Sequence, residues 1–403
     1  MLRYEIKKVF SESKNRMAVI VLFVILVITS VLTINKVEYV DEKGNHFVGI
    51  SAARDLREAK NEWKGYLTED TLSKALEENR TINNSKEALS DDITEQNKAY
   101  AKKQGIVSII DVISQAFSEY RDYNYYAADN VSDDEVGAIY ERRISALKEW
   151  FDSGEETFTQ EEKDFMIQKY EDLETPFYYE YMDGWAALLQ NISTFILILA
   201  LVIGFFVSGI FSDEFQAKAD SIFFSTRFGR SRGISAKVGA GFCITTGFYV
   251  IFVLLYTFIV LFVLGVDGAN CPIQLDLWRS VYNITFLQAY LFIVLGGYIG
   301  TIFASTLAML VSALTRSTPT AIIVPFIVLC AFPFLSRIIT LPGLCSFFPD
   351  QLLEIYLDIK EAGLVTLGGK VTTIATVIVP VYAVICLILL PVLYKVYKKT
   401  EIK

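Results

Sequence analysis

The sequence contains a single histidine, His46, and only five cysteines in 403 residues. One histidine excludes the H-E-x-x-H zinc motif and leaves little basis for a histidine-dependent catalytic triad. We expect His46 to be a solvated turn residue. The cysteines are scattered, so neither a zinc site nor a disulfide framework is indicated, although Cys271 and Cys345 could pair. The other three lie in apolar runs: Cys243, Cys330 and Cys386.

The sequence also lacks the phosphate-binding pattern G-x-x-x-x-G-K-[ST]. The nearest segment, GLVTLGGKV from Gly363 to Val371, has an additional glycine before Lys370 and no hydroxyl residue after it. The apolar runs contain no paired carboxylates for acid–base chemistry either. We therefore expect no cofactor bound by this chain and no enzymatic activity of its own.

Ionisable residues are nearly absent from the long apolar runs, where Arg337 is the one exception. Transporters driven by protons or ions need such groups at mid-membrane, where a charge is costly and therefore functional. Their absence argues for an energy source outside the chain.

The composition is that of an integral membrane protein. Hydrophobic residues make up 53% of the chain, aromatic residues 14%, and the mean hydropathy is +0.38. The charged residues, 21% of the total, are unevenly distributed. Residues 36–185 contain 18 Lys and Arg and 34 Asp and Glu, a net charge of −16. The chain thus combines apolar segments with one large acidic segment.

Six apolar runs are long enough to span a membrane. They cover residues 17–35, 186–211, 238–266, 284–314, 319–338 and 371–394. Six spans place both termini and the basic segment 212–237 in the cytoplasm, as the positive-inside rule requires. No small-residue cleavage site follows Ile34, which favours an uncleaved anchor over a signal peptide. Residues 1–16 contain five basic residues and are expected to form a cytoplasmic interfacial helix.

Residues 36–185 predict a helical extracytoplasmic domain. Two apolar stripes have helical spacing, and we expect further helices over about 50–79 and 84–103. Capping boxes are indicated at Ser132 with Glu135 and at Thr159 with Glu162. The stripes are Ile106, Ile109, Ile110, Ile113 and Phe117, and Val136, Ile139, Ile144, Leu147 and Phe151. The fold class is therefore an all-α membrane protein with six transmembrane helices plus this helical domain.

Features of the outer side and of the spans leave some alternatives open. The aromatic residues of 175–185 predict a belt at the outer interface, and residues 345–360 predict an outer interfacial helix. Gly296 and Gly300 favour close helix contact, either within the subunit or in a dimer. The prolines of 319–338 kink a helix, either for packing or for conformational change.

The segment 212–237 carries more structure than a connector needs. Ser212 is a candidate helix cap before Asp213 and Glu214, and Phe215, Ile222, Phe223 and Phe224 supply an apolar side. Five basic residues follow in and after this helix: Lys218, Arg227, Arg230, Arg232 and Lys237. A membrane-surface helix with solvated charges and no partner is the alternative interpretation.

This order of features resembles the cytoplasmic loop of ABC-2 type ABC transporter permeases. The resemblance extends over the whole membrane part in topology and loop order, and a large extracellular insert between the first two spans occurs in part of that family. It implies that residues of the loop couple the permease to an ATPase. We expect this role for Asp213, Glu214, Phe215, Lys218, Phe223, Arg227 and Arg230.

The resemblance implies the permease subunit of an ATP-driven exporter in a bacterial plasma membrane, moving a hydrophobic or amphipathic substrate. The expected partners are an ABC ATPase subunit that holds ATP and magnesium, a second permease copy or sister permease, and membrane lipids, with no nucleic acid. The acidic outer domain suits a cationic antimicrobial peptide, but an ordinary solubilising surface explains its charge equally well. The alternative function is a membrane sensor or receptor whose extracellular domain binds a ligand.

Overall fold

The structure, a computed structural model, describes residues 1–330 and 345–400. Within these ranges, five helices are long and apolar enough to cross a membrane, which confirms the all-α membrane class. At a rise of about 1.5 Å per residue, even the shortest of them reaches across a hydrocarbon core of about 30 Å. These helices are α2 (Ser13–Ile34), α9 (Asp183–Ser208), α12 (Ile234–Leu264), α13 (Phe286–Thr315) and α17 (Ile374–Lys398).

The sixth predicted span, 319–338, is described only in part. Helix α14 (Thr318–Cys330) contains Pro319 in its first turn and Pro325 in its interior. The remainder of the predicted span, with Pro333 and Arg337, lies outside the described residues. The prediction of six spans therefore stays a prediction.

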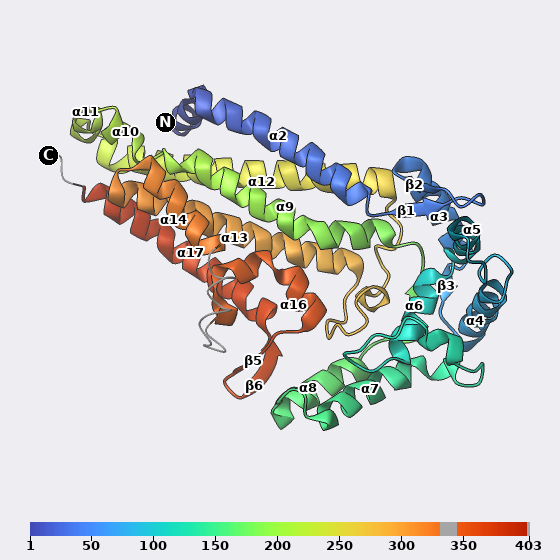
Figure 1. Ribbon diagram of the computed structural model, residues 1–403. Helices are drawn as coiled ribbons and strands as arrows, with labels where there is room; N and C mark the ends of the chain where they lie inside the picture. Colours follow the sequence, from blue (N-terminus) through green and yellow to red (C-terminus); the bar gives the residue numbers. More distant parts are fainter. Residues whose placement is uncertain (331–344, 401–403) are drawn as a thin grey trace.

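Helix α13 is the centre of the bundle, because it packs against α9, α12, α14 and α17 (Figure 1). Helix α2 lies at the edge of the bundle (Figure 1) and has exposed apolar side chains such as Ile20 and Val24. The N-terminus and the last turns of α17 lie at one end of the bundle, which we call the terminal end (Figure 1). The domain between α2 and α9 lies at the opposite end, the outer-domain end.

Gly296 and Gly300 of α13 allow close packing against other segments of the same chain. A Cβ atom at Gly296 would collide with Ile355, and one at Gly300 would lie 3.1 Å from Leu353 Cδ2. These contacts favour the interpretation of the motif as packing inside one chain rather than between two.

The domain at the outer-domain end is mainly helical, with two short antiparallel strand pairs. Its helices are α3 (Ile50–Asn61), α4 (Glu69–Asn83), α5 (Ile93–Lys103), α6 (Val107–Ala116), α7 (Ile139–Ser153) and α8 (Gln160–Glu171), with 3-10 turns η1 (Ala127–Asn130) and η2 (Val136–Ala138). Strands β1 (Glu38–Val40) and β2 (His46–Val48) pair antiparallel, as do β3 (Gly65–Tyr66) and β4 (Tyr178–Tyr179).

Two helix boundaries in this domain were predicted wrongly. The helix expected over 50–79 is interrupted, because β3 pairs with β4 and Thr68 caps the start of α4. The helix expected over 84–103 begins only at Ile93, where Asp92 accepts a bond from the Thr94 amide. Strand pairing between residues more than a hundred positions apart leaves no local signal in the sequence.

The predicted apolar stripes are confirmed as core. All of their residues are buried except Phe117 and Ile144, which are half-buried. The capping box at Thr159 is present, with Glu162 returning a bond to the Thr159 amide. At Ser132 the box is incomplete: the Ser132 amide and hydroxyl both donate to Glu135 Oε2, but the Glu135 amide donates to the Ser132 carbonyl, and η2 follows before α7 begins.

The aromatic residues of 175–185 do not form an exposed belt, so that prediction is wrong for most of them. Phe177, Tyr179, Tyr181 and Trp185 are buried inside the protein. Trp185 Nε1 donates a hydrogen bond to the Val266 carbonyl at 3.0 Å. These side chains join the domain to residues 265–285, which include η4 (Ile273–Leu275), rather than to lipid.

The single outer helix expected over 345–360 is also replaced by shorter elements. These are η5 (Cys345–Phe347), η6 (Pro349–Leu353) and α16 (Ile355–Glu361), followed by a hairpin of β5 (Leu364–Leu367) and β6 (Lys370–Thr373). Leu352, Ile355 and Ile359 are buried against the helix bundle, so this segment is a packed part of the protein. Cys271 is buried and free, and the side chain of Cys345 lies outside the described residues.

Candidate functional site

The segment 212–237 lies at the terminal end of the bundle and is not one continuous helix (Figure 1). It forms α10 (Asp213–Gln216), α11 (Asp220–Ser225) and the π-helical turn η3 (Gly229–Gly233). Between α10 and α11, Lys218 has a φ of 54°, in the left-handed region that ends a helix. The predicted single helix is therefore wrong.

Ser212 does not cap α10 as predicted. Its hydroxyl oxygen lies 2.7 Å from Thr318 Oγ1 at the start of α14, and Gln216 Nε2 donates to the same Thr318 oxygen at 2.9 Å. The two bonds fasten α10 to α14.

Glu214 is the centre of a buried ion cluster that joins three helices. Its Oε1 accepts a bond from Lys237 Nζ at 2.7 Å and another from Lys8 Nζ at 2.8 Å. Lys237 has no exposed surface, and it also donates to the Ile210 carbonyl at 2.7 Å and lies 3.3 Å from Glu5 Oε2. We call Glu5, Lys8, Glu214 and Lys237 the terminal ion cluster. Through it α10 is joined to α12 and to α1 (Leu2–Ser11).

The charges of this cluster depend on one another. Burial alone would raise the pKa of Glu214, but Lys237 and Lys8 outweigh burial and hold it below its usual value. Lys8 behaves in the complementary way: burial acts to lower its pKa, and the Glu214 charge raises it. At neutral pH, Glu214 is thus ionised and unavailable for contact with a partner protein.

The surroundings of Asp213 disfavour the ionised form of its carboxyl group. Burial, followed by repulsion from Glu12, raises the pKa of Asp213 to about 6, although Lys8 and Lys14 act in the opposite direction. This carboxyl group is half-buried. Its predicted role in docking therefore has little support from its position.

The aromatic side chains of the loop pack on α17 rather than lying along a membrane surface. Phe215, Phe223 and Phe224 have ring centroids 6.1, 6.2 and 5.2 Å from that of Tyr397. Tyr397 is completely buried. Helices α10 and α11 thus pack against the last turns of α17.

Arg230 is also engaged within the protein. Its Nη1 donates to the Lys398 carbonyl at 2.8 Å and to the Thr400 carbonyl at 3.1 Å, and its guanidinium group lies 4.8 Å from the Phe224 ring centroid. These carbonyls belong to the end of α17, where a cation is favourable. Arg230 fixes the loop to the C-terminal helix.

What remains exposed is a surface of mixed basic and apolar character. Ile222 is 69% exposed, Phe228 is 36% exposed, and the Arg227 and Arg232 guanidinium groups lie 5.2 and 4.9 Å from the Phe228 ring centroid. We call the following set the basic–apolar surface: Lys218, Ile222, Arg227, Phe228 and Arg232.

Apart from Asp213, the predicted site residues therefore separate into two groups. Lys218 and Arg227 lie on the basic–apolar surface, whereas Glu214, Phe215, Phe223 and Arg230 hold the loop in place. Asp213 is half-buried and belongs to neither group. The sequence reasoning missed Phe228 as a surface residue, although its position between basic residues was a usable signal. It also missed Lys8 and Tyr397, whose partners lie far away in the chain.

Within residues 1–330 and 345–400, no group of three or more His, Cys, Asp or Glu side chains is arranged to hold a metal ion. Residues 17–355 match the family model described as ABC-2 family transporter protein. No curated protein and no solved structure matches the chain.

Proposed function

This chain belongs to the ABC-2 family of transporter proteins, and we propose that it is the permease subunit of an exporter driven by a separate ABC ATPase. The chain is a multi-pass membrane protein of a transporter family. The identity of the energy source, the direction of transport and the substrate are parts of the proposal.

The observation that carries the proposal is the basic–apolar surface at the terminal end. Exposed Ile222 and Phe228 offer apolar contact, Arg227 and Arg232 lie against the Phe228 ring, and Lys218 adds an exposed positive charge in the same loop. Interfaces between proteins commonly combine aromatic and arginine anchors in this way. The elements beneath the surface are joined to α1, α12, α14 and α17, so docking on it would move the bundle.

The proposed orientation places the terminal end in the cytoplasm, where an ATPase is found. The N-terminus, segment 212–237 and the end of α17 are basic, as the positive-inside rule requires of cytoplasmic segments. The acidic domain is then extracellular, in a plasma membrane that we propose to be bacterial.

We propose that the chain works as a homodimer or beside a sister permease, with two ATPase subunits that hold ATP and magnesium. The proposed substrate is hydrophobic or amphipathic, and a cationic antimicrobial peptide is a specific candidate. The net charge of −16 over residues 36–185 supports a cationic molecule.

Purification of the intact protein from its native membrane tests the proposal. A permease is expected to retain a P-loop ATPase and to stimulate ATP hydrolysis when reconstituted with it in lipid. Retention of a signalling protein instead, with no effect on ATP hydrolysis, would favour the sensor or receptor alternative.

A further inference from the structure

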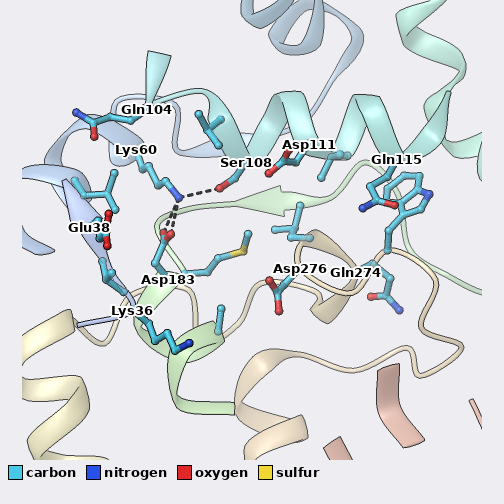
Figure 2. A pocket seen from close by; sticks show the side chains of 18 of the residues that line it. Lys36, Glu38, Lys60, Gln104, Ser108, Asp111, Gln115, Asp183, Gln274 and Asp276 are labelled. Atoms are coloured by element: carbon cyan, nitrogen blue, oxygen red, sulfur yellow. Dashed lines mark hydrogen bonds and ion pairs between the residues drawn. The ribbon is translucent and has the colours of Figure 1, made fainter. Parts of the chain in front are cut away.

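The outer-domain end contains a cavity of about 670 Å³ between the extracellular domain and the start of α9 (Figure 2). Small-molecule sites commonly have volumes of about 300–1,000 Å³. The wall is formed by α3, α5, α6, the first turn of α9 and residues 274–278 around η4. Segments far apart in the sequence thus enclose one space.

Carboxylates are more numerous than cations on this wall. Four line it, Glu38, Asp111, Asp183 and Asp276, together with two amines, Lys36 and Lys60. Lys60 is already committed, because its Nζ bonds both Asp183 oxygens at 2.7 and 2.8 Å and Ser108 Oγ at 2.9 Å. In Figure 2 these bonds lie on the side of the pocket away from Gln115 and Gln274.

Asp276 is without a partner. Its side chain faces the cavity, and within residues 1–330 and 345–400 no hydrogen bond or ion pair reaches its carboxylate. Asp276 is an exposed residue, and partial desolvation by the surrounding protein, followed by the nearby Asp183 charge, raises the pKa of its carboxyl group to about 6. A positive charge placed beside this carboxylate would therefore be stabilised.

Gln274 supplies a second and independent sign of a missing ligand. Its side chain is fully buried, and its Nε2 donates to the Ser280 and Tyr282 carbonyls at 3.3 and 2.8 Å, which fixes the amide orientation. Among the described residues, its Oε1 has no hydrogen-bond partner. In Figure 2 this oxygen lies on the side of Asp276. A buried acceptor without a donor is unfavourable, and a ligand N–H would satisfy it.

The other residues of the cavity wall suit the apolar part of a ligand that carries such an N–H group. Tyr100, Tyr123 and Tyr125 are exposed by 43, 39 and 52%, and Trp278 lies deeper. Aromatic faces attract ammonium and guanidinium groups. Tyr123 also donates to Asp111 Oδ1 at 2.9 Å, which orients this carboxylate.

We propose that this cavity is a binding site for a compact organic cation, a molecule that carries an ammonium or guanidinium group on an aromatic or aliphatic body. Asp276 and Asp111 neutralise the charge, Gln274 accepts an N–H bond, and the tyrosines contact the body. A metal ion is disfavoured, because no group of three potential ligands converges among the described residues. The site requires neither an ATPase nor transport, so it stands or falls independently of the proposed function.

The test is calorimetric titration of the intact protein in lipid nanodiscs with 2-phenylethylammonium and its neutral isostere 2-phenylethanol. The salt is physiological, where the Debye length of about 8 Å removes attraction by the distant acidic surface. We expect one bound cation per chain and at least tenfold weaker binding of the alcohol.

Asp276→Asn and Asp111→Asn are each expected to weaken binding of 2-phenylethylammonium at least tenfold. The matched control, Asp91→Asn, removes an exposed carboxylate of the same domain that does not line the cavity, and it should leave the affinity unchanged. Comparison of amine with alcohol on the unaltered protein is decisive even if a variant does not fold. Equal binding of amine and alcohol, no binding of the amine, unchanged affinity in both cavity variants, or displacement of the amine by calcium would each overturn the proposal.

Discussion

The Glu214 carboxylate and the Lys237 ammonium group lie 2.7 Å apart, and Lys237 has no exposed surface. A buried ion pair is costly to break, because removal of one partner leaves the other charge unpaired in a medium that solvates it poorly. The contact therefore fixes the position of α10 relative to α12. The Glu214–Lys237 pair positions the loop that carries the basic–apolar surface, but neither residue belongs to that surface.

Replacement of Lys237 by methionine tests this role. We expect Lys237→Met to destabilise the protein by about 3–5 kcal/mol, because Glu214 keeps its charge without its principal partner. The measurement is the thermal unfolding midpoint of the purified protein in detergent. Lys8→Met should cost less, since Lys8 is 39% exposed and water replaces its contact.

The double variant Lys237→Met, Glu214→Gln is the control for that experiment. It removes both buried charges together and leaves Glu5 and Lys8, which are partly exposed, so we expect it to recover a large part of the lost stability. A double variant as unstable as the single one would mean that the lysine packs rather than pairs.

Tyr397 offers a second test of how the loop is held. The side chain is completely buried beneath Phe215, Phe223 and Phe224, and its hydroxyl group has no partner among the described residues. We expect Tyr397→Ala to cost about 3–5 kcal/mol, as for other large aromatic truncations, and to increase proteolysis of the loop. Tyr397→Phe should keep the unfolding midpoint, and a large loss in this variant would contradict the packing interpretation.

The sequence predicts the helices of the membrane part well. For segment 212–237 it predicts which types of residue are present but not the structure that they form. Apolar length alone identifies a span, and burial of residues such as Ile109 and Leu147 follows from helical spacing. The break at Lys218 follows from a positive φ that lysine does not signal. The partner of Glu214 on α1 is 206 positions away, a contact that no local pattern carries.

The same limit applies to the outer side of the protein. Apolar residues such as Tyr181 and Leu352 satisfy the pattern for a membrane interface, yet both are buried in protein. Composition identifies a surface that avoids water, but it does not say whether lipid or protein covers that surface. The cavity was equally hidden, because Gln274 and Asp111 come from distant segments.

Asp213 predicts a dependence of stability on pH. Its folded pKa of about 6 exceeds the usual value of about 3.9, so the folded protein binds this proton more tightly than the unfolded chain. The resulting stabilisation is complete below about pH 3.9 and is lost as the pH rises through about 6. We expect Asp213→Asn to raise the unfolding midpoint at neutral pH and to flatten its decrease between about pH 5 and 7. An unchanged pH profile would show that Asp213 is not the titrating group, and Asp91→Asn serves as the control.

The membrane orientation has a direct chemical test. In a chain with Cys243 replaced by serine, a cysteine at exposed Ser225 should resist a membrane-impermeant thiol reagent in intact cells. A cysteine at Leu89, which is 73% exposed in the outer domain, should react. Labelling at Ser225 but not at Leu89 would invert the proposed topology.

The basic–apolar surface gives the sharpest test of coupling. We expect Phe228→Asp and Arg227→Glu each to weaken association with the ATPase at least tenfold, because an apolar contact or a favourable charge is replaced by an unfavourable one. The measurements are co-purification and ATPase stimulation in lipid. Both side chains are exposed, so the unfolding midpoint should stay unchanged. The matched control is Tyr4→Asp, which changes a 77% exposed aromatic residue on α1, outside this surface. If Tyr4→Asp weakens the complex as much as Phe228→Asp, the effect is a general one of negative charge at the terminal end. If neither loop variant weakens it, the ATPase docks elsewhere.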